Sequence, residues 1–69
     1  SLRKNQAMLG KSEVVLVDGV SKNNKRMLSG RTESLKVVNF EGDESLVGQY
    51  VKVKITEAHT WSLNGEICE

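Results

Sequence analysis

The sequence contains no proline, one cysteine, and only one residue each of tryptophan, tyrosine and phenylalanine. A single thiol cannot form an internal disulfide, so a domain of 69 residues must rely on its apolar core for stability. A lone cysteine is also typical of a reducing compartment. No segment approaches the roughly 20 apolar residues that cross a bilayer, and residues 1–10 lack the apolar centre of a secretion signal. We therefore expect a cytoplasmic protein, or part of one.

The sequence also contains few residues that could form a catalytic or metal-binding site. The chain has one histidine, His59, and one cysteine, Cys68, whereas a metal site needs three or four clustered ligands. The glycines match neither the P-loop nor the dinucleotide-binding pattern. Cys68 with His59 as its base would be a conceivable nucleophile, but a free cysteine is more often a small buried apolar residue. We predict a non-catalytic domain with no cofactor or metal of its own.

The net charge of +1 conceals two halves of opposite sign. Residues 1–36 carry eight basic and three acidic side chains, whereas residues 37–69 carry two basic and six acidic ones. A net charge of +5 on the first half favours one basic face that could contact phosphates. The total is nevertheless far from that of a strongly basic nucleic-acid-binding domain. Charges scattered around the surface without a partner remain the alternative.

Short apolar segments bounded by turn residues predict five strands. Alternation is clearest in residues 49–58, where Val51, Val53 and Ile55 point one way, while residues 13–18 are so apolar that both faces could be covered. Five short strands indicate a small five-stranded antiparallel barrel of the OB type. We expect it to span residues 12–69, after a short helical or linker segment, residues 1–11, that leads from a preceding domain. The expected strands are residues 13–18, 25–30, 35–40, 49–58 and 62–68, with turns at 19–24 and 31–34 and an acidic loop at 41–45.

Aromatic and basic residues are the candidates for contacts with a ligand. We predict that Phe40 and Tyr50 lie in the core, because aromatic side chains dominate small cores. Trp61 lies in a polar loop, where it would either stack on a nucleic-acid base or close one end of the barrel. We place Gly65 in a strand where two backbones approach closely, not in a hairpin turn. The basic candidates for phosphate contacts are Lys22, Lys25, Arg26, Arg31 and Lys36.

Three segments occur together in an order that is specific: "LSGRTESLKVVNFEG" (28–42), "LVGQYVKVKITEA" (46–58) and "SLNGEI" (62–67). They resemble the TRAM domain at the C-terminus of bacterial tRNA methylthiotransferases of the MiaB branch. The resemblance runs from about Val15 to Ile67. It implies a five-stranded antiparallel barrel that binds RNA, chiefly tRNA, beside a radical-SAM catalytic domain. The parent enzyme would use 4Fe-4S clusters and S-adenosylmethionine to thiomethylate an adenosine next to the anticodon.

Carried over to this chain, the resemblance assigns RNA contacts to Arg31, Thr32, Lys36, Asn39 and Ser62. The chain departs from the family at Trp61, where an indole is unusual, and at Asn64, where a basic residue is common. Two functions remain open. The domain would bind the anticodon stem-loop of tRNA as a monomer, or it would dock on the preceding catalytic domain of the same chain and orient it, with little RNA contact.

Overall fold

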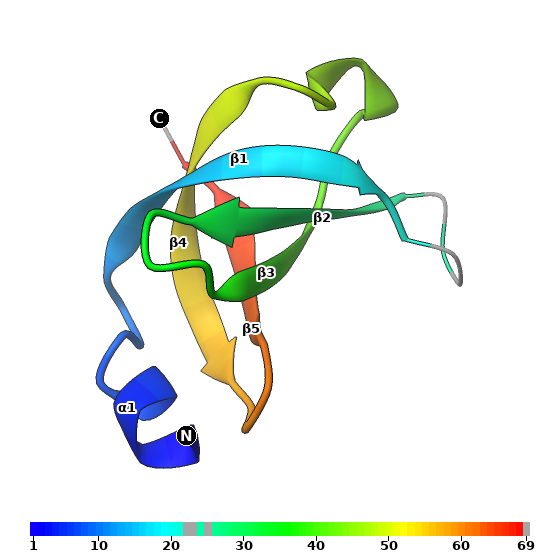
Figure 1. Cartoon of the computed structure of the whole chain (residues 1–69). Helices are drawn as coiled ribbons and strands as arrows, with labels where there is room; N and C mark the ends of the chain where they lie inside the picture. Colours follow the sequence, from blue (N-terminus) through cyan, green and yellow to red (C-terminus); the bar gives the residue numbers. More distant parts are fainter. Residues whose placement is uncertain (22–23, 25, 69) are drawn as a thin grey trace.

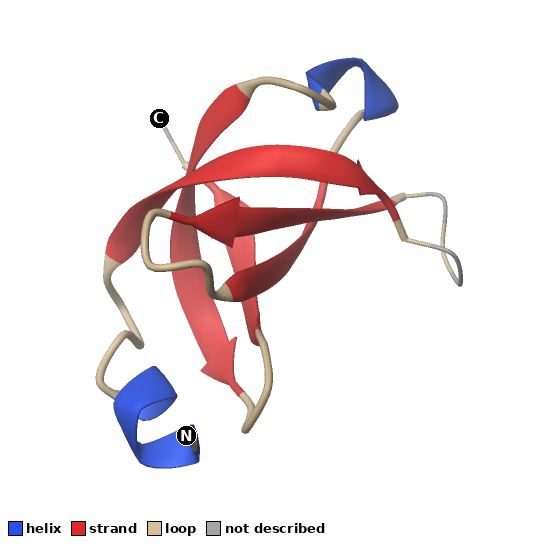
Figure 2. Cartoon of the chain, in the orientation of Figure 1, coloured by secondary structure: helices blue, strands red, loops and turns tan. Residues whose placement is uncertain are grey.

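The computed structural model of the chain describes residues 1–21, 24 and 26–68. Five strands form a closed barrel in the order β1-β2-β3-β5-β4, with one short helix beneath it (Figure 1, Figure 2). The described residues contain no helix that is both long and apolar enough to cross a membrane. The elements are α1 (Leu2–Gln6), β1 (Ser12–Val20), β2 (Met27–Thr32), β3 (Val37–Glu41), the 3-10 turn η1 (Glu44–Leu46), β4 (Tyr50–Ala58) and β5 (Leu63–Ile67).

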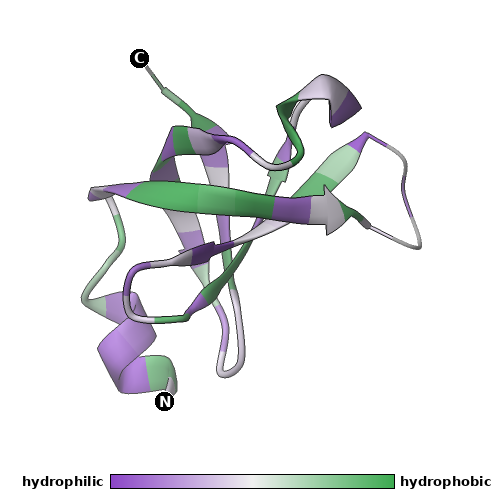
Figure 3. Ribbon diagram, turned by 45° about the horizontal axis from the view of Figure 1, so that its top comes forward, coloured by the Kyte–Doolittle hydropathy of each residue, from purple (hydrophilic) through white to green (hydrophobic). Residues whose placement is uncertain are grey.

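The core is made by every second residue of the strands. All five strands contribute, and each core side chain is at most 1% exposed. Burying one such side chain stabilises the fold by about 1.5–3 kcal/mol before entropy is counted. Figure 3 shows the contrast between the largely hydrophobic β1 and the hydrophilic α1. The core consists of Val15, Val17, Leu28, Val38, Phe40, Val53, Ile55 and Leu63.

The predicted five-stranded barrel is confirmed, with one difference in strand direction. Four neighbouring pairs are antiparallel, but β3 and β5 run parallel, with Val38 opposite Leu63. A closed ring of five strands cannot alternate direction throughout, because five is odd. The parallel pair is therefore a consequence of closure, which no single segment of the sequence encodes.

Two inward-facing glycines allow neighbouring strands to approach closely. A Cβ atom at Gly65 would lie 2.5 Å from both the carbonyl oxygen of Lys54 and Cγ1 of Val53. A Cβ atom at Gly30 would overlap Cγ1 of Val15 and lie 2.6 Å from the carbonyl oxygen of Leu16. The prediction that Gly65 stands in a strand at a close backbone approach is confirmed.

Several sequence-based expectations about burial are wrong. Tyr50 is 72% exposed, because the inward positions of β4 are Val51, Val53 and Ile55 and residue 50 has the opposite parity. β1 is covered on one face only, so Val14 is 57% exposed and Leu16 is 36% exposed. Of the two alternatives left open for Trp61, closing the barrel is excluded, because the side chain is 88% exposed. Phe40 lies in the core as predicted.

Element boundaries differ from the predicted ones where hydrogen bonds extend or shorten a strand. β2 continues through Arg31 and Thr32, since the backbone N–H of Thr32 donates to the carbonyl of Lys36 at 3.0 Å. The turn is therefore residues 33–35 and not 31–34. The helix in the first segment ends at Gln6, and Gly10, with φ +78°, precedes the entry into β1.

Candidate nucleic-acid interface

A row of uncharged polar side chains crosses the outer face of β2, β3 and β5. Ser29 stands opposite Asn39, and Asn39 stands opposite Asn64 on the other side of β3. All three are partly exposed, because their neighbours Leu28, Phe40 and Gly65 take the inward positions. Amide and hydroxyl groups can both donate and accept hydrogen bonds. This row is therefore suited to contact base edges or ribose hydroxyls. Of its three residues, only Asn39 was predicted from the sequence to contact RNA.

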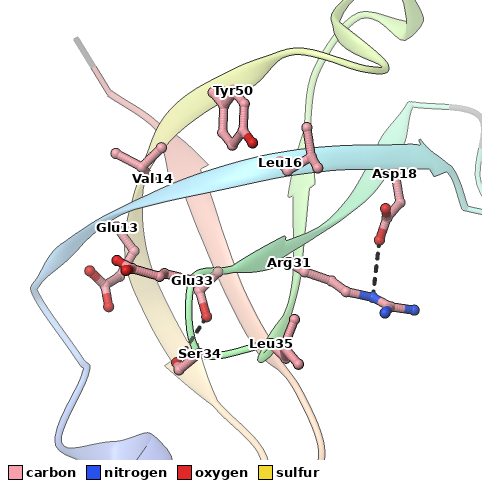
Figure 4. Close-up of a pocket in the computed structure, with 10 residues that line it drawn as sticks. Glu13, Val14, Leu16, Asp18, Arg31, Glu33, Ser34, Leu35 and Tyr50 are labelled. Carbon is pink, nitrogen blue, oxygen red and sulfur yellow. Dashed lines mark hydrogen bonds and ion pairs between the residues drawn. The ribbon is translucent and has the colours of Figure 1, made fainter.

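Arg31 projects outward at the end of β2 and is not free. Its Nε atom lies 3.2 Å from Oδ2 of Asp18 on the neighbouring strand, with both side chains about half exposed (Figure 4). An exposed ion pair of this kind contributes only about 0–1 kcal/mol to stability. The terminal nitrogens of the guanidinium point away from Asp18 in Figure 4. Arg31 can thus offer a forked donor to a phosphate, although Asp18 offsets part of its charge.

Thr32 has a structural position. It is buried, and its Oγ1 atom accepts a hydrogen bond from the backbone N–H of Lys36 at 3.2 Å. The same oxygen lies 3.1 Å from Oγ of Ser34. These contacts close the 33–35 turn. The hydroxyl of Thr32 therefore stabilises the β2–β3 hairpin.

Asn5 on α1 is buried and joins three parts of the chain. Its Nδ2 atom donates to the carbonyl oxygens of His59 at 2.6 Å and Thr60 at 3.2 Å. Nζ of Lys36 donates to Oδ1 of Asn5 at 2.5 Å. The partner of Lys36 is neutral, so its positive charge is held in place without being cancelled. Sequence analysis missed Asn5, because its partners lie 31, 54 and 55 residues away.

Asn5 thereby links Lys36 and the β4–β5 loop to α1 at one end of the barrel. Arg3 and Lys4 are its exposed neighbours on α1, and Trp61 follows Thr60 in the β4–β5 loop. That loop is closed by a hydrogen bond from the N–H of His59 to the carbonyl of Ser62, 2.9 Å long. Figure 1 shows α1 and this loop at the same end of the molecule. We call Arg3, Lys4, Lys36 and Trp61 the basic end.

The remaining predicted contacts lie at the β1–β2 connection. Arg26 is exposed, its backbone N–H donates to Oδ1 of Asn24 at 3.0 Å, and its carbonyl accepts from Gly42 at 3.0 Å. Lys22 and Lys25 lie outside the described residues. The predicted residues thus do not form one cluster. Those in the described residues are distributed over the β1–β2 and β4–β5 loops, the β2–β3 face, and the β2–β3 connection that carries Lys36.

The described part of the chain contains no cluster of side chains that could bind a metal ion, and its histidine and cysteine lie apart. Across residues 1–21, 24 and 26–68 no three His, Cys, Asp or Glu side chains are arranged to hold a metal ion. Cys68 follows β5, and its Sγ atom lies 3.6 Å from Oγ of Ser12. His59 precedes β5 and lies 3.3 Å from Glu57. The two residues stand at opposite ends of β5, and residues 1–21, 24 and 26–68 contain no ligand set for the 4Fe-4S clusters implied for a parent enzyme.

Comparison with known proteins shows which proteins this chain is similar to. The family model described as "TRAM domain" matches residues 6–68. The chain is 56% identical over its full 69 residues to tRNA-2-methylthio-N(6)-dimethylallyladenosine synthase of Bacillus cereus (strain B4264). It is 54% identical over the same length to the enzyme of that name from Bacillus thuringiensis (strain Al Hakam). In both cases the chain spans 14% of the relative's length.

The resemblance inferred from the sequence is therefore confirmed, and with it the relation to tRNA methylthiotransferases. TRAM domains are non-catalytic RNA-binding domains, and the catalytic activity of such longer enzymes lies outside them. The matched region covers all five strands of the barrel as well as the last residue of α1. This chain belongs to the TRAM domain family.

Proposed function

We propose that the chain is the tRNA-recognition module of a longer tRNA-modifying methylthiotransferase. The observation that carries the proposal is where the candidate residues lie on the barrel. OB-type barrels bind nucleic acid with the face of strands 2 and 3 and with the loops that join strands 1–2 and 4–5. The candidates lie on those three parts: Arg26 in the first loop, Arg31 and Asn39 on the face, and Trp61 and Ser62 in the second loop.

Binding divides between cations that contact phosphates and planar groups that contact bases. Arg31, Lys36 and Arg26, together with Lys22 and Lys25 of the same loop, would supply the salt-dependent attraction to the RNA backbone. Trp61 would stack on an unpaired base, a contact worth about 1–3 kcal/mol. Asn39 and Ser62 would contribute hydrogen bonds. Thr32 would act through the turn that positions Lys36.

Within tRNA, we propose the anticodon stem-loop as the region bound, because the relatives are named for modification of an adenosine. Unpaired loop bases are also what stacking platforms recognise. The domain would act as a monomer in the cytoplasm, beside a preceding catalytic domain. That catalytic domain, and not this chain, would hold the 4Fe-4S clusters and S-adenosylmethionine.

The second candidate function is a docking module that orients the catalytic domain. A specific observation favours it: Val14, Leu16, Leu35 and Tyr50 are exposed together along a shallow groove. Exposed apolar surface of this kind marks a contact with a partner. The four apolar residues are not among the proposed RNA contacts, and only Arg31 and the buried Thr32 belong to both sets, so one function does not exclude the other.

The phosphate-contact mechanism is tested by binding of an anticodon stem-loop RNA across a salt series. Each phosphate that the domain neutralises should contribute about −0.7 to −0.9 to the slope of log affinity against log salt concentration. We expect Arg31→Ala to weaken binding and to reduce that slope by about one such step. Asp18→Asn should act in the opposite direction and strengthen binding, because it removes the acid beside Arg31.

Both variants should unfold at nearly the same temperature as the unchanged chain, since the exposed ion pair contributes little to stability. An affinity that does not vary with salt would refute the mechanism. A large loss of thermal stability in Arg31→Ala would show instead that Arg31 has a structural role.

A further inference from the structure

We propose that the shallow groove on the outer face of β1 is the surface that docks on the preceding catalytic domain, separately from the RNA-binding surface. The inference rests on the proposed function, because it takes the longer enzyme as the setting. It goes beyond it by assigning docking to this groove and RNA contact to the β2–β3–β5 row and the basic end, with Arg31 lying where the two surfaces meet. We call this surface the β1 groove; its lining includes Val14, Leu16, Asp18, Arg31, Leu35 and Tyr50 (Figure 4).

The apolar part of the β1 groove is formed by residues from three elements. Leu16 of β1 stands directly opposite Tyr50 of β4 in the antiparallel register, and Val14 lies two residues earlier on the same face. Leu35 enters from the 33–35 turn and is 73% exposed. Side chains that far apart in the chain gather on one exposed surface only through barrel closure. None of these four side chains belongs to the core, so a polar residue at any of these positions would leave the core packing unchanged.

Leu35 is the clearest sign that the groove serves contact with a partner. Its φ angle is +65°, in the left-handed region that bulky side chains avoid. Three-residue hairpin loops normally place glycine at such a position. The chain thus holds a leucine where the backbone disfavours it and where it adds nothing to the buried core. Strained residues of this kind cluster at functional sites.

The charges around the groove favour a protein partner over RNA. The lining includes Glu13, Asp18 and Glu33 against one cation, Arg31, which already faces Asp18. One further cation, Lys52 of β4, stands opposite Val14 beside the groove. Three carboxylates against these two cations leave a net negative charge, which disfavours a polyanion over the apolar part of the groove. The uncharged row at Ser29, Asn39 and Asn64 and the basic end present the opposite character. A partner surface with apolar side chains and some lysine or arginine is complementary to the groove.

The length of the relatives indicates where such a partner would come from. The chain corresponds to 14% of each of the two Bacillus relatives, so most of such an enzyme lies outside it. The groove starts at Glu13, one residue into β1, and α1 lies just before that strand. A domain joined ahead of α1 is tethered near the groove, and a tether raises its effective concentration there. A small apolar surface is then sufficient for docking.

The test is hydroxyl-radical footprinting, read by mass spectrometry, on the full-length protein that contains this chain and on the 69-residue chain alone. The isolated chain is suitable because the barrel and its core are complete within it. We expect Tyr50 and Leu35 to be oxidised several-fold more slowly in the full-length protein, whereas Trp61 is oxidised equally in both. Adding anticodon stem-loop RNA should then protect Trp61 and leave Tyr50 and Leu35 unchanged.

Variants provide the second measurement. The isolated chain is titrated with the remainder of the protein, produced as a separate polypeptide, and the dissociation constant is compared between variants. Leu35→Asn combined with Tyr50→Thr should weaken association by about tenfold, as expected for central apolar contacts. Both replacements suit their backbone positions, because asparagine tolerates a positive φ and threonine favours strands. Val47→Thr, which alters an exposed apolar residue outside the groove, is the matched control and should have no effect.

Three results would overturn the proposal. Equal oxidation of Tyr50 and Leu35 in the full-length protein and in the isolated chain would show that the groove is not covered. Protection of these residues by RNA would make it a nucleic-acid site. Concentration-dependent dimerisation that Leu35→Asn abolishes would make the occupant a second copy. If RNA fails to protect Trp61 while Tyr50 and Leu35 are still protected in the full-length protein, only the proposed RNA-binding function is refuted.

Discussion

Substituting alanine for Gly65 tests the close strand approach that closes the barrel. The added Cβ atom would lie 2.5 Å from the carbonyl oxygen of Lys54, which is backbone and cannot rotate away. β4 and β5 would have to separate, although Leu63 and Ile55 must stay packed in the core. Gly30→Ala produces the same conflict between β2 and β1, where the nearest backbone atom is 2.6 Å away.

The expected loss can be set against the stability of a domain this small. Overpacking a well-packed interior costs typically 1–3 kcal/mol. A 69-residue domain has a free energy of unfolding of roughly 3–10 kcal/mol, so either substitution removes a large share of it. For a domain of this length each kcal/mol shifts the thermal midpoint by about 4–8 °C. We therefore expect the midpoint to fall by about 8–16 °C for a loss near 2 kcal/mol.

The assay is thermal unfolding followed by circular dichroism, with Gly19→Ala as the matched control. A methyl group at Gly19 meets no atom within 4 Å, so this variant should be neutral or slightly more stable. Equal midpoints for Gly65→Ala and Gly19→Ala would show that β4 and β5 are not in close contact at Gly65. A lower midpoint for Gly19→Ala alone would contradict the described register of β1.

Three further predictions concern single side chains. Leu35→Gly should leave the thermal midpoint unchanged or raise it, because relief of the positive φ offsets the greater entropy of glycine when unfolded; a loss of 2 kcal/mol or more would place Leu35 in the core. Asn5→Ala should cost about 1–3 kcal/mol and speed hydrogen exchange at residues 59–62, because it removes three hydrogen bonds; unaltered exchange there would mean that α1 does not hold the loop. Trp61→Ala should weaken RNA binding by about 1–3 kcal/mol without changing the thermal midpoint, and unaltered affinity would exclude base stacking.

The sequence by itself determined the fold class and several of its parts, because those depend on local patterns. Alternation in residues 50–58 identified β4 and the inward positions of Val53 and Ile55. The aromatic character of Phe40 and the lack of a side chain at Gly65 led to the correct placement of both. The same alternation also implied that Tyr50 points outward, so that error came from giving aromatic character more weight than parity.

Only the tertiary structure decided which residues meet, because that depends on how five strands close into one ring. Asn5 bonds to groups 31 to 55 residues away, and no local pattern distinguishes it from any other polar residue of a short helix. The β1–β2 register brings Arg31 beside Asp18, and this changes an apparently free cation into a paired one. The exposure of Leu16, Leu35 and Tyr50 on one surface follows from the same closure, which turns one side of β1 outward and forms the β1 groove.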